Sequence, residues 1–252
     1  MDFNADLGES FGLWERGADE ALMRVISSAN IACGFHAGDP GAMRRAVAQA
    51  RAHGVHIGAH PGLPDLLGFG RRAMNVSADE VRDYVLYQVA ALDGFAKGLH
   101  HVKPHGALYM MALDDAAIAR AIAEAVALYQ EGLPVYTLAG GELWDAAAAV
   151  GLPAVPEFFA DRPLRADGSV VMFGWQELFT PTPEAVGLRV RSLLETGTVP
   201  ALGGTPVAVQ AETVCVHSDT PRADELGVAV RAVIGERAPE EAPMNGGGGV
   251  NV

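Results

Sequence analysis

The stretch VKPHGALY, residues 102–109, begins like the end of a buried strand and runs into the first turn of a helix. A lysine, a proline and a histidine follow the valine at once, so ionisable side chains stand where the apolar segment stops. Gly106 and Ala107 then allow a helix to begin close by, because small residues permit tight backbone turns. This order is typical of parallel α/β folds, in which polar residues gather at the carboxyl ends of the strands.

The same unit recurs along the chain. Short apolar or β-branched runs, punctuated by Gly or Pro, predict buried parallel strands at residues 2–7, 29–35, 54–59, 100–103, 134–139, 153–159 and 212–216. Capping residues or cap-then-proline pairs indicate helix starts between them, at Asp39-Pro40, Ser77 with Glu80, Thr182-Pro183 and Thr220-Pro221. Seven such units without a Pro- or Ser-rich linker predict one α/β domain, either a barrel or an open sheet.

The predicted domain covers residues 1–236. An excursion interrupts it at about residues 160–181, where Asp167-Gly168 is typical of a hairpin turn. Residues 237–252 contain too few apolar side chains to pack and are predicted to form a mobile tail. The glycine run in this tail lacks the Lys-Ser/Thr of a phosphate-binding loop.

The composition excludes several classes of partner. Half of the 252 residues are hydrophobic, the net charge is −13, and no basic cluster occurs, which argues against nucleic acid and anionic membranes. No apolar run approaches the roughly 20 residues of a membrane span, and the N-terminal segment lacks the features of a signal peptide. Cys33 and Cys215 lie in apolar runs and are expected to act as small hydrophobes, so a cytoplasmic protein is expected.

Polar side chains follow six of the predicted strands. Because parallel strands all end on the same side of a sheet, these segments are expected to share one rim where ligands bind. The candidate residues are Asn4, Asp6, Glu9, His36, His60, Lys103, His105, Tyr109, Glu157, Arg162, His217 and Asp219. A single histidine is often only a satisfied semi-buried group, and Asp39 is expected to be only a helix cap. The coincidence across the strand ends nevertheless favours a functional site.

The side chains available at this rim suit hydrolysis. The sequence has no G-x-S-x-G elbow, no Walker loop and no G-x-G-x-x-G after its first strand, which disfavours a serine nucleophile and ordinary nucleotide binding. Carboxylates and imidazoles can activate water, while cations stabilise the developing oxyanion. Several His and Asp side chains could also converge on zinc or a similar ion, but no close pair such as H-E-x-x-H fixes a metal site.

Five motifs resemble the LamB/YcsF family over nearly the whole chain: FNADLGESFG, ISSANIACGFHAGDP, IGAHPGLPDLLGFGRR, HVKPHGALY and EFFADR. The resemblance implies a seven-stranded (β/α) barrel similar to the glycoside hydrolase/deacetylase superfamily. It also implies the A subunit of ATP-dependent 5-oxoprolinase, which opens the lactam ring of 5-oxo-L-proline (pyroglutamate) to L-glutamate together with subunits B and C.

The resemblance also implies roles for the rim residues. Asp6, His36, His60 and His105 are expected to be catalytic. Expected to bind substrate or phosphate are Asn4, Glu9, Lys103, Tyr109, Glu157, Arg162, His217 and Asp219. ATP is the expected co-substrate, at a place the sequence does not fix, and a divalent metal is compatible but unassigned. Two other functions stay open, a metal-dependent deacetylase-like amidohydrolase and a non-catalytic protein that only holds a small acid for its partner chains.

Overall fold

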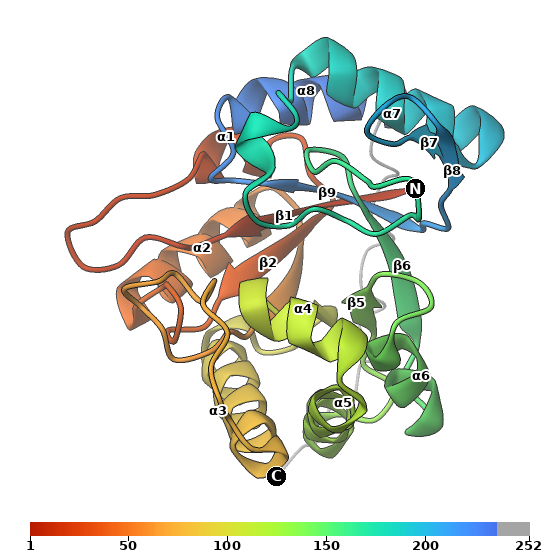
Figure 1. The fold of residues 1–252 in the computed structure, drawn as a ribbon. Helices are drawn as coiled ribbons and strands as arrows, with labels where there is room; N and C mark the ends of the chain where they lie inside the picture. The colour runs from red at the N-terminus through yellow and green to blue at the C-terminus, as the bar shows by residue number, and fades with distance from the viewer. Residues whose placement is uncertain (236–252) are drawn as a thin grey trace, which may run out of the picture.

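A computed structural model of the chain describes residues 1–235, so the predicted tail at 237–252 lies outside the described residues. Its centre is a closed barrel of seven strands, each parallel to its neighbours, with helices packed around it (Figure 1). The strands follow the order β1 (Asp2–Leu7), β2 (Ser28–Ala32), β3 (His56–His60), β4 (His101–Val102), β5 (Val135–Thr137), β6 (Ala154–Phe159) and β9 (Thr213–His217). The predicted (β/α) barrel is therefore confirmed, and the alternative of an open sheet is wrong.

Helices connect most of the strands. They are α1 (Asp19–Met23), α2 (Pro40–Ala52), α3 (Ala78–Ala96), α4 (Gly106–Asp114), α5 (Ala116–Tyr129), α6 (Glu142–Ala149), α7 (Pro183–Thr196) and α8 (Ala223–Ile234). The predicted caps Asp39, Ser77 and Thr182 each accept a hydrogen bond from the first turn of their helix. No helix within residues 1–235 combines the length and the apolar content that crossing a membrane requires.

The predicted start of the last helix at Thr220-Pro221 is wrong. Helix α8 begins at Ala223, after Arg222 in a left-handed conformation. The reason is that the Thr220 hydroxyl is engaged elsewhere: it donates to Asp161 Oδ2 at 2.6 Å and accepts from Arg162 Nη1 at 2.9 Å. Thr220 thus helps to build the end of the barrel instead of capping a helix.

Two additions to the repeating unit lie between β6 and β9. The segment after β6 forms an isolated antiparallel bridge between Leu164 and Val170, followed by the short 3-10 helix η1 (Trp175–Glu177). After α7, the strands β7 (Thr198–Pro200) and β8 (Pro206–Ala208) form an antiparallel pair outside the barrel that the sequence did not predict.

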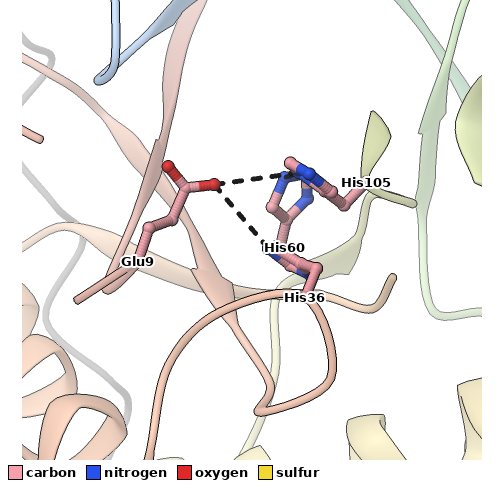
Figure 2. A group of neighbouring side chains, drawn as sticks. All are labelled: Glu9, His36, His60 and His105. Carbon is pink, nitrogen blue, oxygen red and sulfur yellow. Dashed lines mark hydrogen bonds and ion pairs between the residues drawn. The ribbon is translucent and has the colours of Figure 1, made fainter. Parts of the chain in front are cut away.

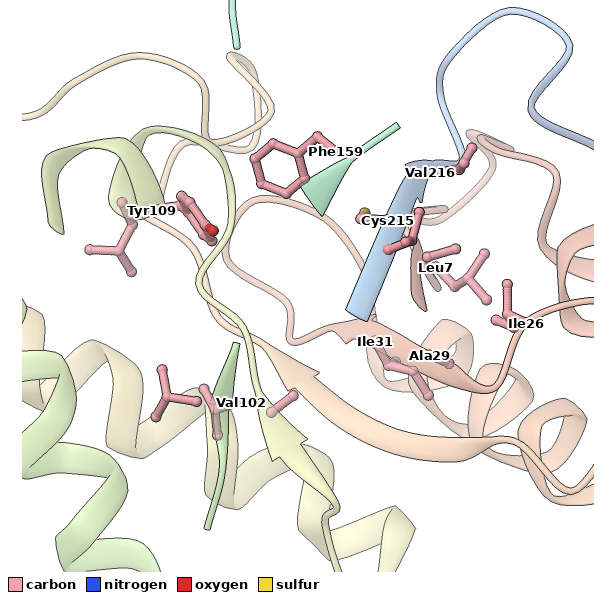
Figure 3. Packing of buried hydrophobic residues seen from close by; sticks show 14 of the residues in the cluster. Leu7, Ile26, Ala29, Ile31, Val102, Tyr109, Phe159, Cys215 and Val216 are labelled. Atoms are coloured by element: carbon pink, nitrogen blue, oxygen red, sulfur yellow. The ribbon is translucent and has the colours of Figure 1, made fainter. Parts of the chain in front are cut away.

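The strands alternate between apolar side chains that contact the helices and polar side chains that fill the barrel. Phe3, Ala5 and Leu7 of β1 belong to the hydrophobic core, part of which is shown in Figure 3. Asn4 and Asp6 between them are also buried, but Asn30 on the neighbouring strand donates to both, at 2.7 and 2.8 Å. The period of two along a strand therefore separates a hydrophobic shell from a polar barrel interior.

A half-buried carboxylate anchors the loop between β1 and α1. Asp19 Oδ2 accepts a hydrogen bond from the Gly8 backbone N–H at 2.8 Å, which holds the turn after β1. Burial raises the pKa of Asp19 from 3.8 to about 6, although the bond from Gly8 opposes the shift. This side chain should therefore make the stability of the barrel depend on pH.

We expect Asp19→Asn to change that dependence. The folded chain holds the Asp19 proton to a higher pH than the unfolded chain does. The contribution of this proton to the stability of the wild type is therefore complete below about pH 3.8 and is lost as the pH rises through about 6. The free energy of unfolding of the variant, taken relative to that of the wild type, should therefore increase by on the order of 2–3 kcal/mol as the pH is raised from about 4 to about 7. Urea unfolding at both pH values measures this, with the exposed Asp114→Asn as a control for losing one charge. An equal difference at both pH values would contradict the prediction.

Candidate functional site

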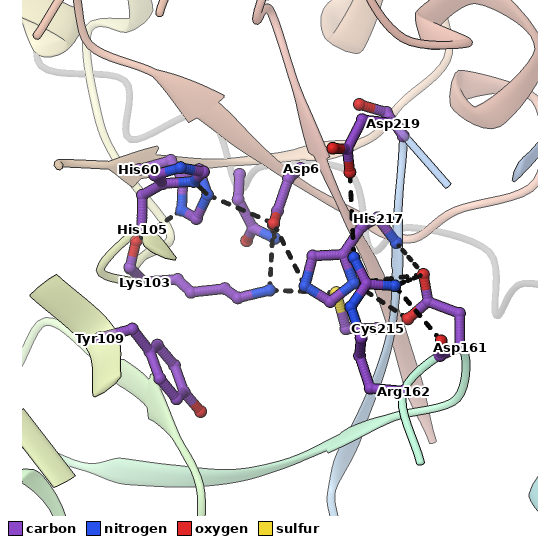
Figure 4. A network of polar contacts seen from close by, with 12 residues as sticks. Asp6, His60, Lys103, His105, Tyr109, Asp161, Arg162, Cys215, His217 and Asp219 are labelled. Carbon is purple, nitrogen blue, oxygen red and sulfur yellow. Dashed lines mark hydrogen bonds and ion pairs between the residues drawn. The ribbon is translucent and has the colours of Figure 1, made fainter. Parts of the chain in front are cut away.

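The centre of the site is a buried lysine at the carboxyl end of β4 (Figure 4). Lys103 is 2% exposed, and its Nζ lies 3.0 Å from Asp6 Oδ1, 2.9 Å from Glu157 Oε1 and 3.0 Å from Cys215 Sγ. Burial alone would lower the pKa of Lys103, but Asp6, Cys215 and Glu157 raise it well above its usual value. The ammonium group therefore stays charged inside the barrel. Cys215 contacts this cation, so the expectation that it only fills apolar space is wrong.

Asp6 links the lysine to two histidines. Its Oδ2 lies 3.3 Å from His60 Nε2 and 3.7 Å from His217 Nε2. Burial would raise the pKa of Asp6, but His60 and Lys103 outweigh it and hold the pKa well below the usual range. Asp6 is therefore a carboxylate under all ordinary conditions, which lets it orient neighbouring donors.

His217 and Asp161 form a second pair. His217 Nδ1 lies 2.9 Å from Asp161 Oδ1, and the carboxylate also accepts from the His217 backbone N–H at 3.1 Å. Burial would raise the pKa of Asp161, but Arg162 and His217 lower it, so it remains an acceptor. Because the carboxylate can only accept, the neutral tautomer of His217 carries its proton on Nδ1 and has its lone pair on Nε2. Asp161 was missed as a site residue, although it lies in the motif EFFADR.

Three guanidinium groups surround Asp219 at the mouth of the site. Its Oδ2 lies 2.7 Å from Arg71 and 3.1 Å from Arg16, and its Oδ1 lies 3.9 Å from Arg162. Arg71 lines the hollow, and its side chain is 29% exposed, whereas that of Arg162 is 1% exposed. Arg162 is paired with Asp161 and stacked over Trp175. Arg71, which lies in the motif LGFGRR, therefore faces the ligand space more directly than the predicted Arg162.

The remaining candidates adjoin this network. Asn4 Nδ2 donates to Glu157 Oε1 at 2.9 Å, and the Tyr109 hydroxyl donates to Glu157 Oε2 at 3.2 Å. Glu9, His36, His60 and His105 form a second cluster (Figure 2), which contacts Asp6 through His60. The structure thus brings all twelve predicted residues together, and it adds Asn30, Arg71, Asp161 and Cys215; their individual roles stay predictions.

The hollow between these side chains is almost closed. Its free volume is about 10 Å³, which suits a single water molecule. It is lined by Asp6, His60, Arg71, Lys103, Pro104, His105, Gly106, Tyr109, Phe159, Met172 and His217. A much larger cavity of about 710 Å³ lies beside it and shares Phe159. A substrate larger than water therefore requires covering side chains to move.

Two groups among the described residues have the donor types of a metal site. One consists of Glu9, His36, His60 and His105, and the other of Asp6, Cys215 and His217. In each group the potential ligand atoms lie within 4.8 Å of one another. The second group is already saturated by Lys103 and Asp161, which compete with an ion for the same atoms.

Comparisons with known proteins agree with this geometry. The sequence profile of the LamB/YcsF family matches residues 1–247. A protein of Bordetella pertussis, named as the A subunit of 5-oxoprolinase, is 51% identical over 239 residues, which are 93% of this chain and 94% of that one. The crystal structure of a lactam utilization protein from Thermus thermophilus superposes with a TM-score of 0.88 at 45% identity, covering 93% and 95% of the two chains. A GH113 β-1,4-mannanase shares the fold alone: the TM-score is 0.52 at 9% identity, and the match covers 92% of this chain and 97% of that one.

Proposed function

This chain belongs to the LamB/YcsF family, and from that premise we propose that it is the A subunit of an ATP-dependent 5-oxoprolinase. Such an enzyme opens the lactam ring of 5-oxo-L-proline (pyroglutamate) to L-glutamate with hydrolysis of ATP. One observation carries the proposal: in a chain 51% identical to a protein with that name, Lys103, Asp6 and the Asp161–His217 pair converge on one hollow.

The charges at the mouth suit an anionic substrate. Arg16, Arg71 and Arg162 surround the single carboxylate of Asp219, and Arg162 is shared with Asp161. The excess positive charge favours a carboxylate or phosphate group, and a guanidinium can bind either with two parallel hydrogen bonds. Arg71 is the guanidinium that lines the hollow, so we assign it to the substrate carboxylate or the transferred phosphate.

ATP makes ring opening favourable by transferring its γ-phosphoryl group to the lactam oxygen, with ADP as the leaving group. One water then attacks the ring carbon, the C–N bond breaks, and the nitrogen takes up a proton and departs as the amine of glutamate. A second water cleaves the acyl phosphate that remains and releases phosphate. The charged Lys103 ammonium would stabilise the negative charge that develops on oxygen during these steps.

The attacking water needs a proton acceptor in the hollow. His217 Nε2 presents its lone pair there, because Asp161 holds the ring proton on Nδ1 at 2.9 Å. A histidine oriented by a carboxylate is a common general base. Asp6, held ionised beside Nε2, would stabilise the imidazolium that forms.

The proposed enzyme includes partner chains. The relatives' name denotes one component of a complex, and we expect subunits B and C, with the reaction in the cytoplasm where ATP is available. Contact with these partner chains would also give a way to open the closed hollow, by moving lining side chains such as Arg71, which is 29% exposed.

Glutamate release from 5-oxo-L-proline tests the proposal. Turnover is expected only when this chain, subunits B and C and ATP are all present, and Asp6→Asn in this chain should abolish it. ATP-independent amide hydrolysis by the isolated chain would instead identify a deacetylase-like amidohydrolase. Unchanged turnover with Asp6→Asn would identify a non-catalytic component that holds a small acid.

A further inference from the structure

The rings of two buried histidines, His60 and His105, each point one nitrogen atom at the other. His60 Nδ1 lies 2.7 Å from the Lys103 carbonyl, and His105 Nε2 lies 2.8 Å from the Phe69 carbonyl. A carbonyl can only accept a hydrogen bond, so each ring carries its proton on that nitrogen. The opposite nitrogens, His60 Nε2 and His105 Nδ1, are therefore both unprotonated when the rings are neutral, yet they lie only 3.0 Å apart.

A buried carboxylate oxygen completes this set of acceptors. Glu9 Oε1 has no hydrogen-bond donor among the described residues, although Glu9 is only 4% exposed. It lies 3.7 Å from His105 Nδ1. When both rings are neutral, three electron-pair donors therefore point at one another inside the protein, and Asp6 Oδ2 lies 3.3 Å from one of them, His60 Nε2. Such an arrangement is costly unless a cation occupies the space between them.

The backbone around the cluster holds the donors in place. Phe69 is a non-glycine residue in the left-handed region, with φ of 54°, and this conformation directs its carbonyl to His105. Gly70 follows with φ of 62°, and a Cβ there would lie 2.6 Å from His36 and 2.8 Å from His105. Metal-ligating histidines almost always donate their other ring N–H to a carbonyl or a carboxylate, as His60 and His105 do here.

We infer that Glu9, His60 and His105 bind one divalent transition-metal ion, with zinc as the best match. Two imidazoles and one carboxylate form a ligand set of catalytic zinc sites, which leave a fourth position open. At metal–ligand distances of about 2.1 Å, adjacent ligand atoms of a tetrahedral site lie about 3.4 Å apart. The separations of 3.0 and 3.7 Å lie on either side of that value, and the third, between Glu9 and His60, is within 4.8 Å, so the three donors already lie close to the arrangement that an ion needs.

His36 supports the site without binding the ion. Its ring is stacked on that of His105, with centroids 3.7 Å apart and planes 4° from parallel. His36 Nε2 also lies 3.7 Å from Glu9 Oε1, as Figure 2 shows, but the two rings are parallel and stacked, so an ion in the plane of the His105 ring lies outside the plane of the His36 ring and away from the His36 lone pair. His36 is therefore a positioning residue that fixes the orientation of His105.

This inference goes beyond the proposed function and does not depend on it, because an ion can bind whatever the substrate is. Since His60 Nε2 lies 3.3 Å from Asp6 Oδ2, an ion bound there would adjoin the hollow. A metal at that place would supply Lewis-acid polarisation of an oxygen atom.

Metal content and metal titration of the full chain test the inference without any activity assay. After chelation and dialysis against zinc, the wild type should bind one ion per chain, whereas Glu9→Gln and His105→Gln should lose stoichiometric binding. His36→Gln should retain the ion with about 10- to 100-fold weaker affinity, as expected for a residue that acts through a ligand. His217→Gln should bind as tightly as the wild type, because His217 belongs to the other donor group.

Thermal unfolding of the metal-free proteins controls for misfolding. Glu9→Gln removes the buried Oε1 that lacks a donor, while its amide oxygen can still accept from Ser218 as Oε2 does, so its metal-free form should be at least as stable as the wild type. Zinc should raise the midpoint of the wild type but not that of Glu9→Gln. Absence of stoichiometric zinc, cobalt or manganese in the wild type would overturn the inference and leave a shared proton between His60 and His105. Loss of the ion in His217→Gln, or equal losses in His36→Gln and His105→Gln, would overturn the ligand assignment.

Discussion

Replacing Lys103 with methionine is expected to lower the free energy of unfolding at neutral pH by about 3–5 kcal/mol. Methionine keeps the unbranched shape of the lysine stem, so little packing should be lost. The loss comes from Asp6 and Glu157, which lie 3.0 and 2.9 Å from the ammonium and would be left as buried carboxylates without their cation. Urea unfolding at neutral pH measures the change, and turnover in the assembled enzyme should also disappear.

The sequence offers a matched control, because Lys97 is the only other lysine. Lys97 is exposed at the end of α3, so Lys97→Met should change the free energy of unfolding by less than about 0.5 kcal/mol. Adding Glu157→Gln to Lys103→Met removes one of the two stranded charges and should recover part of the stability. If Lys103→Met is as stable as Lys97→Met, the lysine does not hold the two carboxylates together as the structure indicates.

The fold was predictable because its signals are local. Each strand-end motif contains both the apolar run that makes the strand and the polar residues that follow it, as VKPHGALY does with Val102, Lys103 and His105. The side on which a residue lies follows from the two-residue period of a strand. Val102 therefore packs in the hydrophobic core while His101 and Lys103 point into the barrel, where they contact Asn30 and Asp6.

The partners within the site were not predictable, because they depend on the register between strands distant in sequence. Parallel pairing sets Asp6 level with His217, 211 residues later, and with Asn30 on the other side. Cys215 was misjudged for the same reason, since its apolar neighbours gave no sign that its thiol contacts a lysine. Arg71 and Arg162 have the same chemistry, and only their tertiary positions show which one lines the hollow.

His217→Gln is expected to lower kcat of the assembled enzyme by about 10²- to 10⁴-fold, with a much smaller change in KM. Glutamine has nearly the length of histidine and can still donate to Asp161, so it can replace the hydrogen bond that joins His217 Nδ1 and Asp161 at 2.9 Å in the wild type. It has no basic nitrogen to take a proton from water. Asp161→Asn should lower kcat by a similarly large factor, because the amide can donate to His217 Nδ1 and so moves the ring proton to Nε2, where the base is needed.

Two further variants separate a proton-transfer role of His217 from a structural one. His101→Gln alters another buried histidine of the barrel interior, which bonds to Asn30 at 2.6 Å and does not line the hollow. It should reduce stability while keeping kcat within about tenfold, as expected for a residue that makes no proton transfer.

His217→Ala should regain part of its lost turnover when free imidazole is added, because a small base can then occupy the vacated space. A His217→Ala enzyme that imidazole does not restore, together with near-normal turnover in His217→Gln, would transfer the role of base to another group. Asp6, the only carboxylate among the residues that line the hollow, would then be the group to test.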